Sequence, residues 1–583
     1  MTDAVKLPLP ELAERFRQAV STAFGSEHAG LDPLVRRSDR ADFQANLAMS
    51  LGKVLKQPPR DVAQALIAAL KVDDICDKVE SAGPGFINLT LKNSYLDTLL
   101  AATFADPRLG VATTQKPDTV VVDYGGPNVA KEMHVGHLRP CVIGDCLVRV
   151  LEFAGHHVIR QNHIGDWGTP FGMLIEHLLD LGGASNAAEL SVGELDVFYK
   201  AARKKFDSDP SFAERSRQRV VLLQGGDAAT LSLWRALVDA STLHFEKVFA
   251  RLGVTMTSKD TRGESFYNGF LPEIAADLQQ RGIASIGDGA LCVFPDGFKN
   301  RDGAPLPLIV RKSDGGFGYA ATDLAALRYR AGELHGTRIL YVVGSPQAQH
   351  FAMVFAVARL AGYVPERVRT EHVGFGSILG SDRKMMKTRS GDTLRLIELL
   401  DEGREQALKL IETRGAEVAD ELKPALAASL SLAAIKYADL SSDRIKDYVF
   451  DWDRMLAPEG NTGVYLQYAQ ARRRSLLRKL AAGETADAQA LRIQHDREHA
   501  LALLLVGFSD AVESVVTSLE PHKLCSFLYD LASAFASFWV ECPVLKQGVP
   551  PEVRASRIAL SDLTGRVLMQ GMSLLGIDAP ERM

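Results

Sequence analysis

Residues 119–169 read TVVVDYGGPNVAKEMHVGHLRPCVIGDCLVRVLEFAGHHVIRQNHIGDWGT, and the rest of the chain is organised around them. Val120–Tyr124 is a short β-branched run, typical of a buried strand, and turn residues follow it. After His134 come apolar residues at spacings of three and four, which predict a helix that ends near Gly155. A second apolar run, His157–Gln161, predicts the next strand. Strand, turn, helix and strand in this order predict a right-handed βαβ unit.

Two histidines lie where the first predicted strand gives way to the predicted helix. They belong to the motif His134-Val135-Gly136-His137. Unpaired backbone N–H groups and the helix dipole make the start of a helix attractive to anions. Two imidazoles can add donors there, and Gly136 has no side chain to keep a nucleotide from the backbone. The motif therefore predicts a phosphate site.

The composition is that of a soluble globular chain. With 583 residues, 46% hydrophobic and 24% charged, the chain has room for roughly three or four domains. The net charge of −5 requires that any basic surface for a nucleic acid be local. The start of the chain lacks a signal-peptide pattern, and no run of about 18 apolar residues is evident, so we expect a cytoplasmic protein without a membrane span. No metal site is expected, because no CxxC pair occurs among the six dispersed cysteines, which favour reduced core thiols: Cys76, Cys141, Cys146, Cys292, Cys525 and Cys542.

The pattern of apolar spacings divides the chain into four parts. Residues 1–112 predict a small α+β domain, and residues 113–392 alternate strand and helix signals, as a mostly parallel Rossmann-like α/β sheet does. A charged helical stretch at about 180–255 reads as an insertion into this domain. Residues 393–455 predict a helical connection, and residues 456–583 predict an all-α bundle. We expect four further strands in the α/β sheet, at 289–294, 307–311, 338–343 and 367–373.

A second basic motif comes about 250 residues after the histidines. Residues 384–391 read KMMKTRSG and follow the glycine-rich loop Gly374–Gly380. Such a loop after the last strand of an α/β sheet lies on the ligand edge of the sheet. On its own it would be an ordinary exposed loop. Together with the histidines, Lys384 and Lys387 indicate a larger phosphate group such as a triphosphate.

The two motifs, HVGH and KMMK, resemble the signature motifs of the class I aminoacyl-tRNA synthetases. Within that class, three runs resemble the arginyl-tRNA synthetase family: PNVAKEMHVGHLRPCVIGD (127–145), GNTGVYLQYAQARRRSLLRK (460–479) and SDRADFQANLAMSLGK (38–53). The resemblance extends over essentially the whole chain, in order. Two positions depart from the family pattern. Met386 replaces the serine of the class form KMSK, and Gly126 stands where the family commonly has serine, which removes a possible hydroxyl contact to the amino acid.

The resemblance implies an ATP-dependent ligase that also uses Mg²⁺. An amino-acid carboxylate would attack the α-phosphorus of ATP, and cations and N–H donors would stabilise the charge on the phosphoryl oxygens. Lys131 is a third candidate cation beside the two lysines of KMMK, because upstream lysines are thought to compensate in relatives that lack the first of these. The implied catalytic residues are His134, Gly136, His137, Lys131, Lys384 and Lys387, and the implied ATP contacts are His134, His137, Lys384, Lys387, His350 and Gly376.

The resemblance also implies which side chains hold the amino acid. A guanidinium requires fixed carboxylates, and Tyr319 and Asp323 are four residues apart, so they share one face if the segment is helical. Glu264 lies in a turn-like segment. Two acids in one pocket would also suit lysine, so a class I lysyl-tRNA synthetase remains an alternative. The implied arginine-binding residues are Asn128, Glu264, Tyr319, Asp323 and Gln347.

A tRNA is the implied second substrate. The helix predicted at 464–480 interleaves aromatic and basic side chains, which suits RNA bases and phosphates. Tyr465, Tyr468 and Arg472 are the candidate contacts, the C-terminal bundle resembles an anticodon-binding domain, and the N-terminal domain resembles a module that contacts the tRNA elbow. The family is usually monomeric, so we expect a monomer.

Two other classes of protein remain as alternatives to an aminoacyl-tRNA synthetase. A small-molecule nucleotidyltransferase could use an HxGH site, but it would need neither the downstream helical bundle nor the N-terminal domain. A non-enzymatic tRNA-binding protein would be expected to carry damaged motifs, whereas His134, Gly136, His137 and Lys387 are all present.

Overall fold

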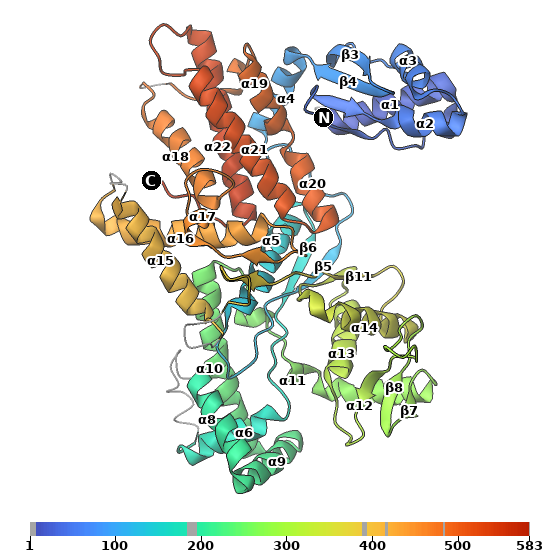
Figure 1. Ribbon diagram of the computed structural model, residues 1–583, viewed down its shortest axis with the longest axis vertical. Coiled ribbons are helices and arrows are strands. Elements are labelled where there is room, and N and C mark those ends of the chain that lie inside the picture. The colour runs from blue at the N-terminus through green and yellow to red at the C-terminus, as the bar shows by residue number, and fades with distance from the viewer. Residues whose placement is uncertain (1–6, 184–194, 387–392, 414–417, 482–483, 582) are drawn as a thin grey trace.

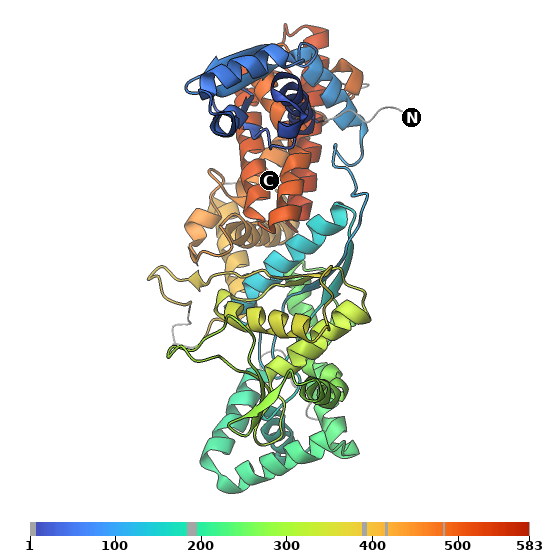
Figure 2. The same ribbon diagram turned by 90° about the vertical axis from the view of Figure 1, so that its right-hand side faces the viewer.

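The computed structural model describes residues 7–583 apart from 184–194, 387–392, 414–417, 482–483 and 582. An N-terminal domain (blue in Figure 1) lies beside the upper end of a helical bundle (orange and red), and an α/β region (cyan to yellow) lies below the bundle. In the view turned by 90° (Figure 2) the N-terminal domain overlaps the bundle at the top of the molecule, and the α/β region lies below both. The predicted fold class, an α/β sheet domain flanked by an N-terminal α+β domain and a C-terminal helical bundle, is confirmed.

The N-terminal domain is a four-stranded sheet covered by helices. Its strand order is β1-β2-β4-β3, and every pairing is antiparallel. Strand β4 is largely buried: Ile87, Asn88, Leu89 and Leu91 are all inaccessible to solvent or nearly so. The elements are α1 Pro8–Phe24, β1 Val35–Arg37, β2 Phe43–Ala45, α2 Leu47–Leu55, α3 Pro59–Ala69, β3 Cys76–Ala82, β4 Phe86–Leu91 and α4 Asn93–Ala105.

The central sheet contains the βαβ unit that the opening stretch predicts. All of its pairings are parallel, in the order β11-β10-β5-β6. Val120, Val121 and Val122 are fully buried, which is why this strand consists of branched apolar residues. The elements are β5 Thr119–Asp123, α5 Leu138–Phe153, β6 His157–Gln161, α13 Tyr319–Gly332, β10 Arg338–Tyr341, α14 Ala348–Leu360 and β11 Arg369–His372.

The helical insertion follows β6. It forms the lowest lobe in Figure 1. Helix α10 ends at Gly253, whose φ of 63° is a left-handed conformation that glycine adopts without strain. The helices are α6 Pro170–Asp180, α8 Leu195–Ser208, α9 Pro210–Gln224 and α10 Ala228–Leu252.

The expectation that residues 289–294 and 307–311 belong to the parallel sheet is wrong. These residues form β8 and β9 of a separate three-stranded antiparallel sheet, in the order β7-β8-β9. An apolar run predicts a strand but does not identify its partner, so the sequence could not separate the two sheets. The elements of this lobe are α11 Glu264–Tyr267, α12 Leu271–Gln280, β7 Ser285–Gly287, β8 Ala290–Val293 and β9 Leu308–Arg311.

The described residues of the last third of the chain are helical apart from two short strands and the connections between elements. Strands β12 and β13 pair in parallel although about 70 residues separate them. The helices pack on one another and on α5 of the central domain. The elements are β12 Ile378–Leu379, α15 Leu396–Thr413, α16 Lys423–Leu440, β13 Tyr448–Val449, α17 Trp452–Met455, α18 Gly463–Arg478, α19 Asp496–Val506, α20 Phe508–Ser518, α21 His522–Glu541 and α22 Pro551–Leu574.

Single 3₁₀ turns complete the secondary structure. They are η1 Ser26–His28, η2 Val135–His137, η3 Ser258–Asp260, η4 Asn268–Phe270, η5 Ser345–Gln347, η6 Asp420–Leu422 and η7 Ala488–Ala490.

One helical stretch within the described part of the chain, Asp496–Ser518, is long and apolar enough to cross a membrane by length and composition. Half of its most apolar window is buried in the protein, and it divides at Gly507 into α19 and α20. Core helices of soluble bundles meet the same criterion, so this stretch is weak support for a membrane span.

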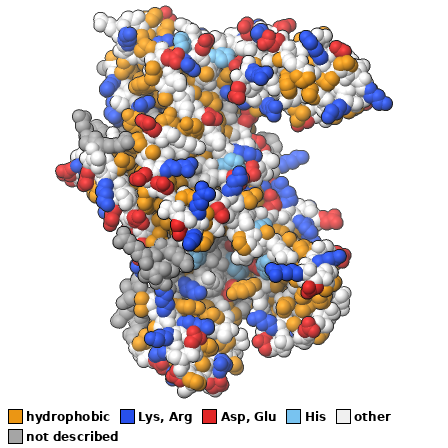
Figure 3. All heavy atoms as spheres, viewed as in Figure 1, with side chains coloured by type: hydrophobic (Ala, Val, Ile, Leu, Met, Phe, Trp, Pro, Cys, Tyr) orange, Lys and Arg blue, Asp and Glu red, His pale blue; other side chains and the backbone are white. Residues whose placement is uncertain are grey.

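The N-terminal domain is attached to the bundle by specific hydrogen bonds. Arg37 donates to the carbonyl of Leu503 (2.7 Å), and the N–H of Ile493 donates to Asp97 (2.9 Å). Below this junction the surface is deeply indented between the N-terminal domain and the α/β region (Figure 3). The molecule is therefore concave on this side, between the N-terminal domain and the α/β region.

Candidate active site

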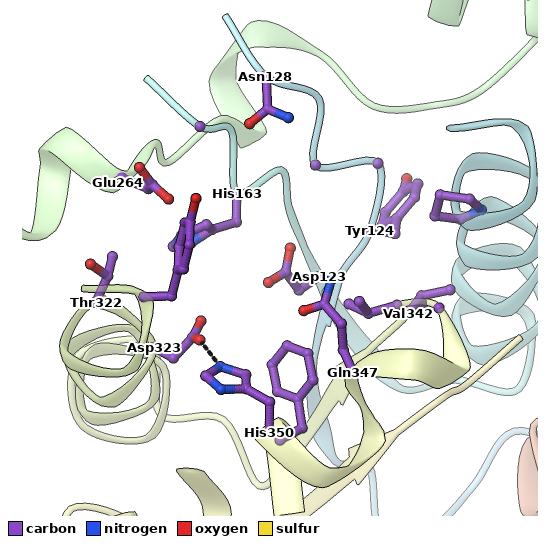
Figure 4. A pocket seen from close by; sticks show the side chains of 18 of the residues that line it. Asp123, Tyr124, Asn128, His163, Glu264, Thr322, Asp323, Val342, Gln347 and His350 are labelled. Atoms are coloured by element: carbon purple, nitrogen blue, oxygen red, sulfur yellow. Dashed lines mark hydrogen bonds and ion pairs between the residues drawn. The ribbon is translucent and has the colours of Figure 1, made fainter. Parts of the chain in front are cut away.

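A cavity of about 590 Å³ opens at the carboxyl ends of β5 and β10. This is the edge at which parallel α/β sheets bind ligands. All five predicted arginine-binding side chains line the cavity, and so does His350 (Figure 4). Further lining residues that the sequence did not single out include Asp123, Tyr124, His163, Thr322 and Phe375.

Helix α13 supplies two of the side chains. Tyr319 and Asp323 are its first and fifth residues, so they share the face that borders the cavity. Tyr319 is 76% exposed and forms the rim, whereas the Asp323 side chain is only 16% exposed. His350, on α14, places Nε2 2.6 Å from Asp323 Oδ2. In this structure His350 therefore contacts Asp323, a predicted arginine-binding residue, and its predicted contact with ATP remains a prediction.

Glu264 is positioned by a carboxylate that comes from a distant part of the sequence. It begins the short helix α11, rather than lying in a plain turn, and the N–H of the next residue, Ser265, donates to Asp166 (2.8 Å). The Ser265 hydroxyl donates to the same carboxylate (2.6 Å). A Cβ on Gly263 would lie 2.2 Å from Asp166 Oδ2, so only glycine allows this close approach. Asp166 therefore holds the helix that carries Glu264, and the sequence did not predict this role.

The two amide side chains lie at other points of the cavity wall. Asn128 is exposed and pairs, through its backbone, with Gly165, where a Cβ would lie 2.3 Å from Asn128 Oδ1. Gln347 is exposed at the end of η5, just before α14. Both amides carry donors and acceptors, as the charged end of an amino acid requires.

Burial and neighbouring acids perturb the carboxylates. Burial, and then the charges of Asp166 and Asp323, raise the pKa of Glu264 to about 7. Burial also raises the pKa of Asp166. A guanidinium placed between Glu264 and Asp323 would remove their mutual repulsion, so the cavity favours a cation.

The raised pKa of Glu264 makes the predicted binding of arginine dependent on pH. Below about pH 7 Glu264 is protonated and loses its charge, so the KM for arginine should rise by about tenfold from pH 8 to pH 6. The measurement is the KM for arginine in ATP–pyrophosphate exchange across that range. In Glu264→Gln the KM should be higher throughout and no longer follow pH. An unchanged KM in the wild type from pH 8 to pH 6 would contradict the assignment.

The two histidines form a compact turn before α5, whose Pro140 lines the cavity. The N–H of Gly136 donates to His134 Nδ1, and the N–H of His134 donates to His137 Nδ1, both at 3.1 Å. Each Nδ1 is therefore an acceptor, and the ring proton of the neutral form lies on Nε2. A Cβ on Gly136 would lie 2.8 Å from the His134 ring, so this glycine permits the turn itself.

Both histidines are held in the neutral form. Burial, and then His134, lower the pKa of His137 to about 3. Burial, and then Lys131, lower the pKa of His134. The pair thus offers two neutral Nε2–H donors beside the start of α5, where partial positive charge accumulates.

The candidate lysines are arranged differently from one another. Lys131 lies over the Tyr199 ring of α8, with Nζ 4.5 Å from the centroid. Lys384 is exposed in a tight turn, where its carbonyl accepts from Gly380 N–H (2.8 Å). Lys387 lies outside the described residues. The Gly376 N–H donates to the carbonyl of Arg444 (2.9 Å), so of its backbone groups only the carbonyl is left for a nucleotide.

The chain on either side of the second motif is anchored. Leu379, before the motif, pairs with Met385 inside it, and Arg395, after the motif, pairs with His134. The N–H of Val135 donates to the carbonyl of Leu394 (2.9 Å). The segment that follows the lysines is thereby hydrogen-bonded to the first motif.

On α18 the candidate tRNA contacts separate into two environments. Tyr468 is exposed, and the guanidinium of Arg472 lies 4.7 Å from its ring centroid. Tyr465 is half-buried and packs against Tyr529. Arg474, in contrast, donates to the carbonyl of Ala579 (3.0 Å) and holds the C-terminus. Tyr468 and Arg472 are therefore the more accessible pair.

A parallel sheet with two histidines at a helix start, and a carboxylate-lined cavity at its ligand edge, is the arrangement of a class I aminoacyl-tRNA synthetase. The class I (R) tRNA synthetase catalytic domain matches residues 99–452, the DALR anticodon-binding domain matches 466–583, and the arginyl-tRNA synthetase N-terminal domain matches 10–91.

Similar proteins narrow the class further. The arginine–tRNA ligase of Thermobifida fusca is 50% identical over 99% of this chain and 100% of its own length. The arginine–tRNA ligase of Alteromonas mediterranea is 47% identical over 98% of this chain and 99% of its own length. The solved arginyl-tRNA synthetase of Plasmodium falciparum superposes with a TM-score of 0.84 at 29% identity, covering 98% of this chain and 99% of that one. The solved arginyl-tRNA synthetase of Thermus thermophilus superposes with a TM-score of 0.81 at 25% sequence identity. The match covers 98% of this chain and 100% of that one. The chain belongs to the arginyl-tRNA synthetase family.

Proposed function

We propose that this chain activates L-arginine with ATP and transfers it to the 3′ end of tRNA(Arg). The arginine carboxylate attacks the α-phosphorus of ATP, pyrophosphate leaves, and arginyl-adenylate forms. A hydroxyl of the terminal ribose of the tRNA then attacks the arginyl carbonyl, and AMP leaves. The observation that carries the proposal is the placement of Glu264 and Asp323 in one cavity, which is also lined by Pro140 of the helix that follows the histidine turn.

Each group of side chains has a separate task in this scheme. Glu264 and Asp323 bind the guanidinium, and Asn128 and Gln347 hold the α-amino and carboxylate end. The Nε2–H groups of His134 and His137 donate to phosphate oxygens as charge develops there, while Lys384 and Lys387 neutralise the departing pyrophosphate. Lys131, His350 and Gly376 complete the proposed contacts to ATP.

A magnesium ion would enter with ATP. Among the described residues no group of three His, Cys, Asp or Glu side chains could hold a metal ion. The groups beside the proposed phosphate position are imidazoles and lysines, which bind phosphate and not Mg²⁺. The proposed catalytic residues therefore do not form a Mg²⁺ site of their own, and the phosphates of ATP would hold the ion.

The tRNA is proposed to bind the C-terminal bundle and the N-terminal domain. Its anticodon would meet Tyr468, Arg472 and Tyr465 on α18, and its elbow would meet the N-terminal domain. We further propose that the protein is a cytoplasmic monomer, which sedimentation of the purified chain would test.

One assay separates this proposal from its alternatives. Arginine-dependent ATP–pyrophosphate exchange is expected with tRNA present, and reduced or absent without it. Exchange with lysine but not with arginine would indicate the other specificity. Absence of exchange with both amino acids, with and without tRNA, would overturn the proposed function.

A further inference from the structure

A buried ion pair joins the helix behind the histidine turn to the helix that leads into the bundle. Arg139, the second residue of α5, is 1% exposed, and its Nε lies 3.2 Å from Asp439 Oδ2 in α16. Asp439 is equally buried. The cost of removing two charges from water is comparable to their attraction, so such a pair is weak support for stability. Its stronger consequence is that it fixes two helices in one relative position.

The same guanidinium reaches a third segment of the chain. Its Nη1 donates to the carbonyl of Lys446 (3.0 Å), and it lies 5.4 Å from the Tyr448 ring and 5.8 Å from the Phe375 ring. Phe375 lines the cavity. Burial, and then the Asp439 carboxylate, raise the pKa of Tyr448, so its hydroxyl keeps its proton beside that carboxylate.

The segment that Arg139 holds is the support for the loop before the second motif. Ser377 N–H donates to Asp447 Oδ1 (2.6 Å), and β12 pairs with β13 through Ile378 and Tyr448. A Cβ on Gly376 would lie 2.7 Å from the carbonyl carbon of Lys446, so the two backbones are in direct contact. From β12 the chain continues into the turn that contains Lys384.

Helix α16 is fastened in turn to the C-terminal bundle. The Tyr437 hydroxyl donates to the carbonyl of Cys525 in α21 (2.9 Å), and Lys436 Nζ donates to the carbonyl of Gly576 after α22 (2.7 Å). The Arg139–Asp439 pair is thus placed between the histidine helix, the lysine segment and the bundle.

We propose that Arg139, Asp439 and Tyr448 are positioning residues for adenylate formation: they fix the 374–385 segment, with Lys384, relative to the turn of His134 and His137. The inference rests on the proposed function. The arginine end of the cavity is held independently, by α11 and α13, so loss of the pair misplaces the ATP contacts and leaves arginine binding intact. An error of about 1 Å in such placement can cost roughly 100-fold in rate.

The test uses the full chain with tRNA in ATP–pyrophosphate exchange, with ATP and arginine varied separately. Asp439→Asn should lower kcat or raise the KM for ATP by about 10- to 100-fold, with the KM for arginine unchanged. Tyr448→Phe should act in the same direction and more weakly. Arg139→Lys, which keeps a charge for Asp439, should retain more activity than Arg139→Met.

Glu498→Gln is the matched control. Glu498 is 1% exposed and pairs with Arg557 at 2.7 Å inside the bundle, far along the chain from the loop. The Glu498→Gln substitution should lower the melting temperature without changing the KM for ATP or the KM for arginine. Equal kinetic losses in Asp439→Asn and Glu498→Gln, or an equal rise in the KM for arginine and for ATP in Asp439→Asn, would overturn the inference.

Two further outcomes are separable. If Asp439→Asn does not fold, the inference is tested with Tyr448→Phe, which removes only one hydroxyl group. Normal ATP kinetics in Tyr448→Phe would then overturn the inference. Absence of exchange in the wild type would reject the proposed function instead.

Discussion

Replacing Asp323 by asparagine is expected to lower kcat/KM for arginine by about 100-fold or more, the loss that follows when one partner of a desolvated charge pair is neutralised. The Asp323 side chain is 16% exposed and lies in the same cavity as Glu264. The asparagine amide can still accept a hydrogen bond, but it cannot neutralise the positive charge of the guanidinium. Most of the loss should appear in the KM for arginine, measured by pyrophosphate exchange at saturating ATP and tRNA.

Glu333→Gln provides the control for this substitution. Glu333 is exposed at the C-terminal end of the same helix, α13, and lies outside the cavity, so its neutralisation should leave the kinetics unchanged. An unaltered KM for arginine in Asp323→Asn would show that the carboxylate does not meet the guanidinium. The exchange rate with lysine should stay at background in both variants.

The parts of the site that the sequence predicted are those governed by local pattern. The strand, turn and helix around His134 follow from the spacing of the apolar residues and the positions of the glycines. The i,i+4 spacing of Tyr319 and Asp323 correctly places both side chains on one helix face at the cavity. The arginine-binding set came from family resemblance. The structure brings all five of its members to one cavity, and their individual roles remain predictions.

What the sequence could not predict depends on contacts between distant segments. Asp166 caps the helix of Glu264 from 99 residues away, and no local pattern connects the two. The contact between His350 and Asp323 spans 27 residues and joins two helices. The Arg139–Asp439 pair requires α5 to pack against α16, 300 residues later. Strand partners are non-local in the same way, which is why β8 and β9 were expected in the wrong sheet.

Replacing His137 by alanine is expected to slow arginine activation by about 100- to 1,000-fold, the range for loss of one preorganised donor to a developing oxyanion. The affinity for tRNA should not change, because His137 lies at the sheet edge and α18 lies in the bundle. Single-turnover adenylate formation measures the first quantity, and filter binding of tRNA measures the second. His157→Ala, which removes an exposed imidazole at the start of β6, should alter neither.

Two further substitutions at residue 137 distinguish catalysis from local structure. His137 Nδ1 accepts from the N–H of His134 at 3.1 Å, which leaves Nε2–H as the donor. Asparagine places its amide near Nδ1 and can preserve the turn, whereas glutamine places its amide near Nε2 and can preserve the donor. If the histidine acts on phosphate, His137→Gln should keep more activity than His137→Asn. The reverse order would mean that His137 serves the turn and that the donor to phosphate is His134 alone.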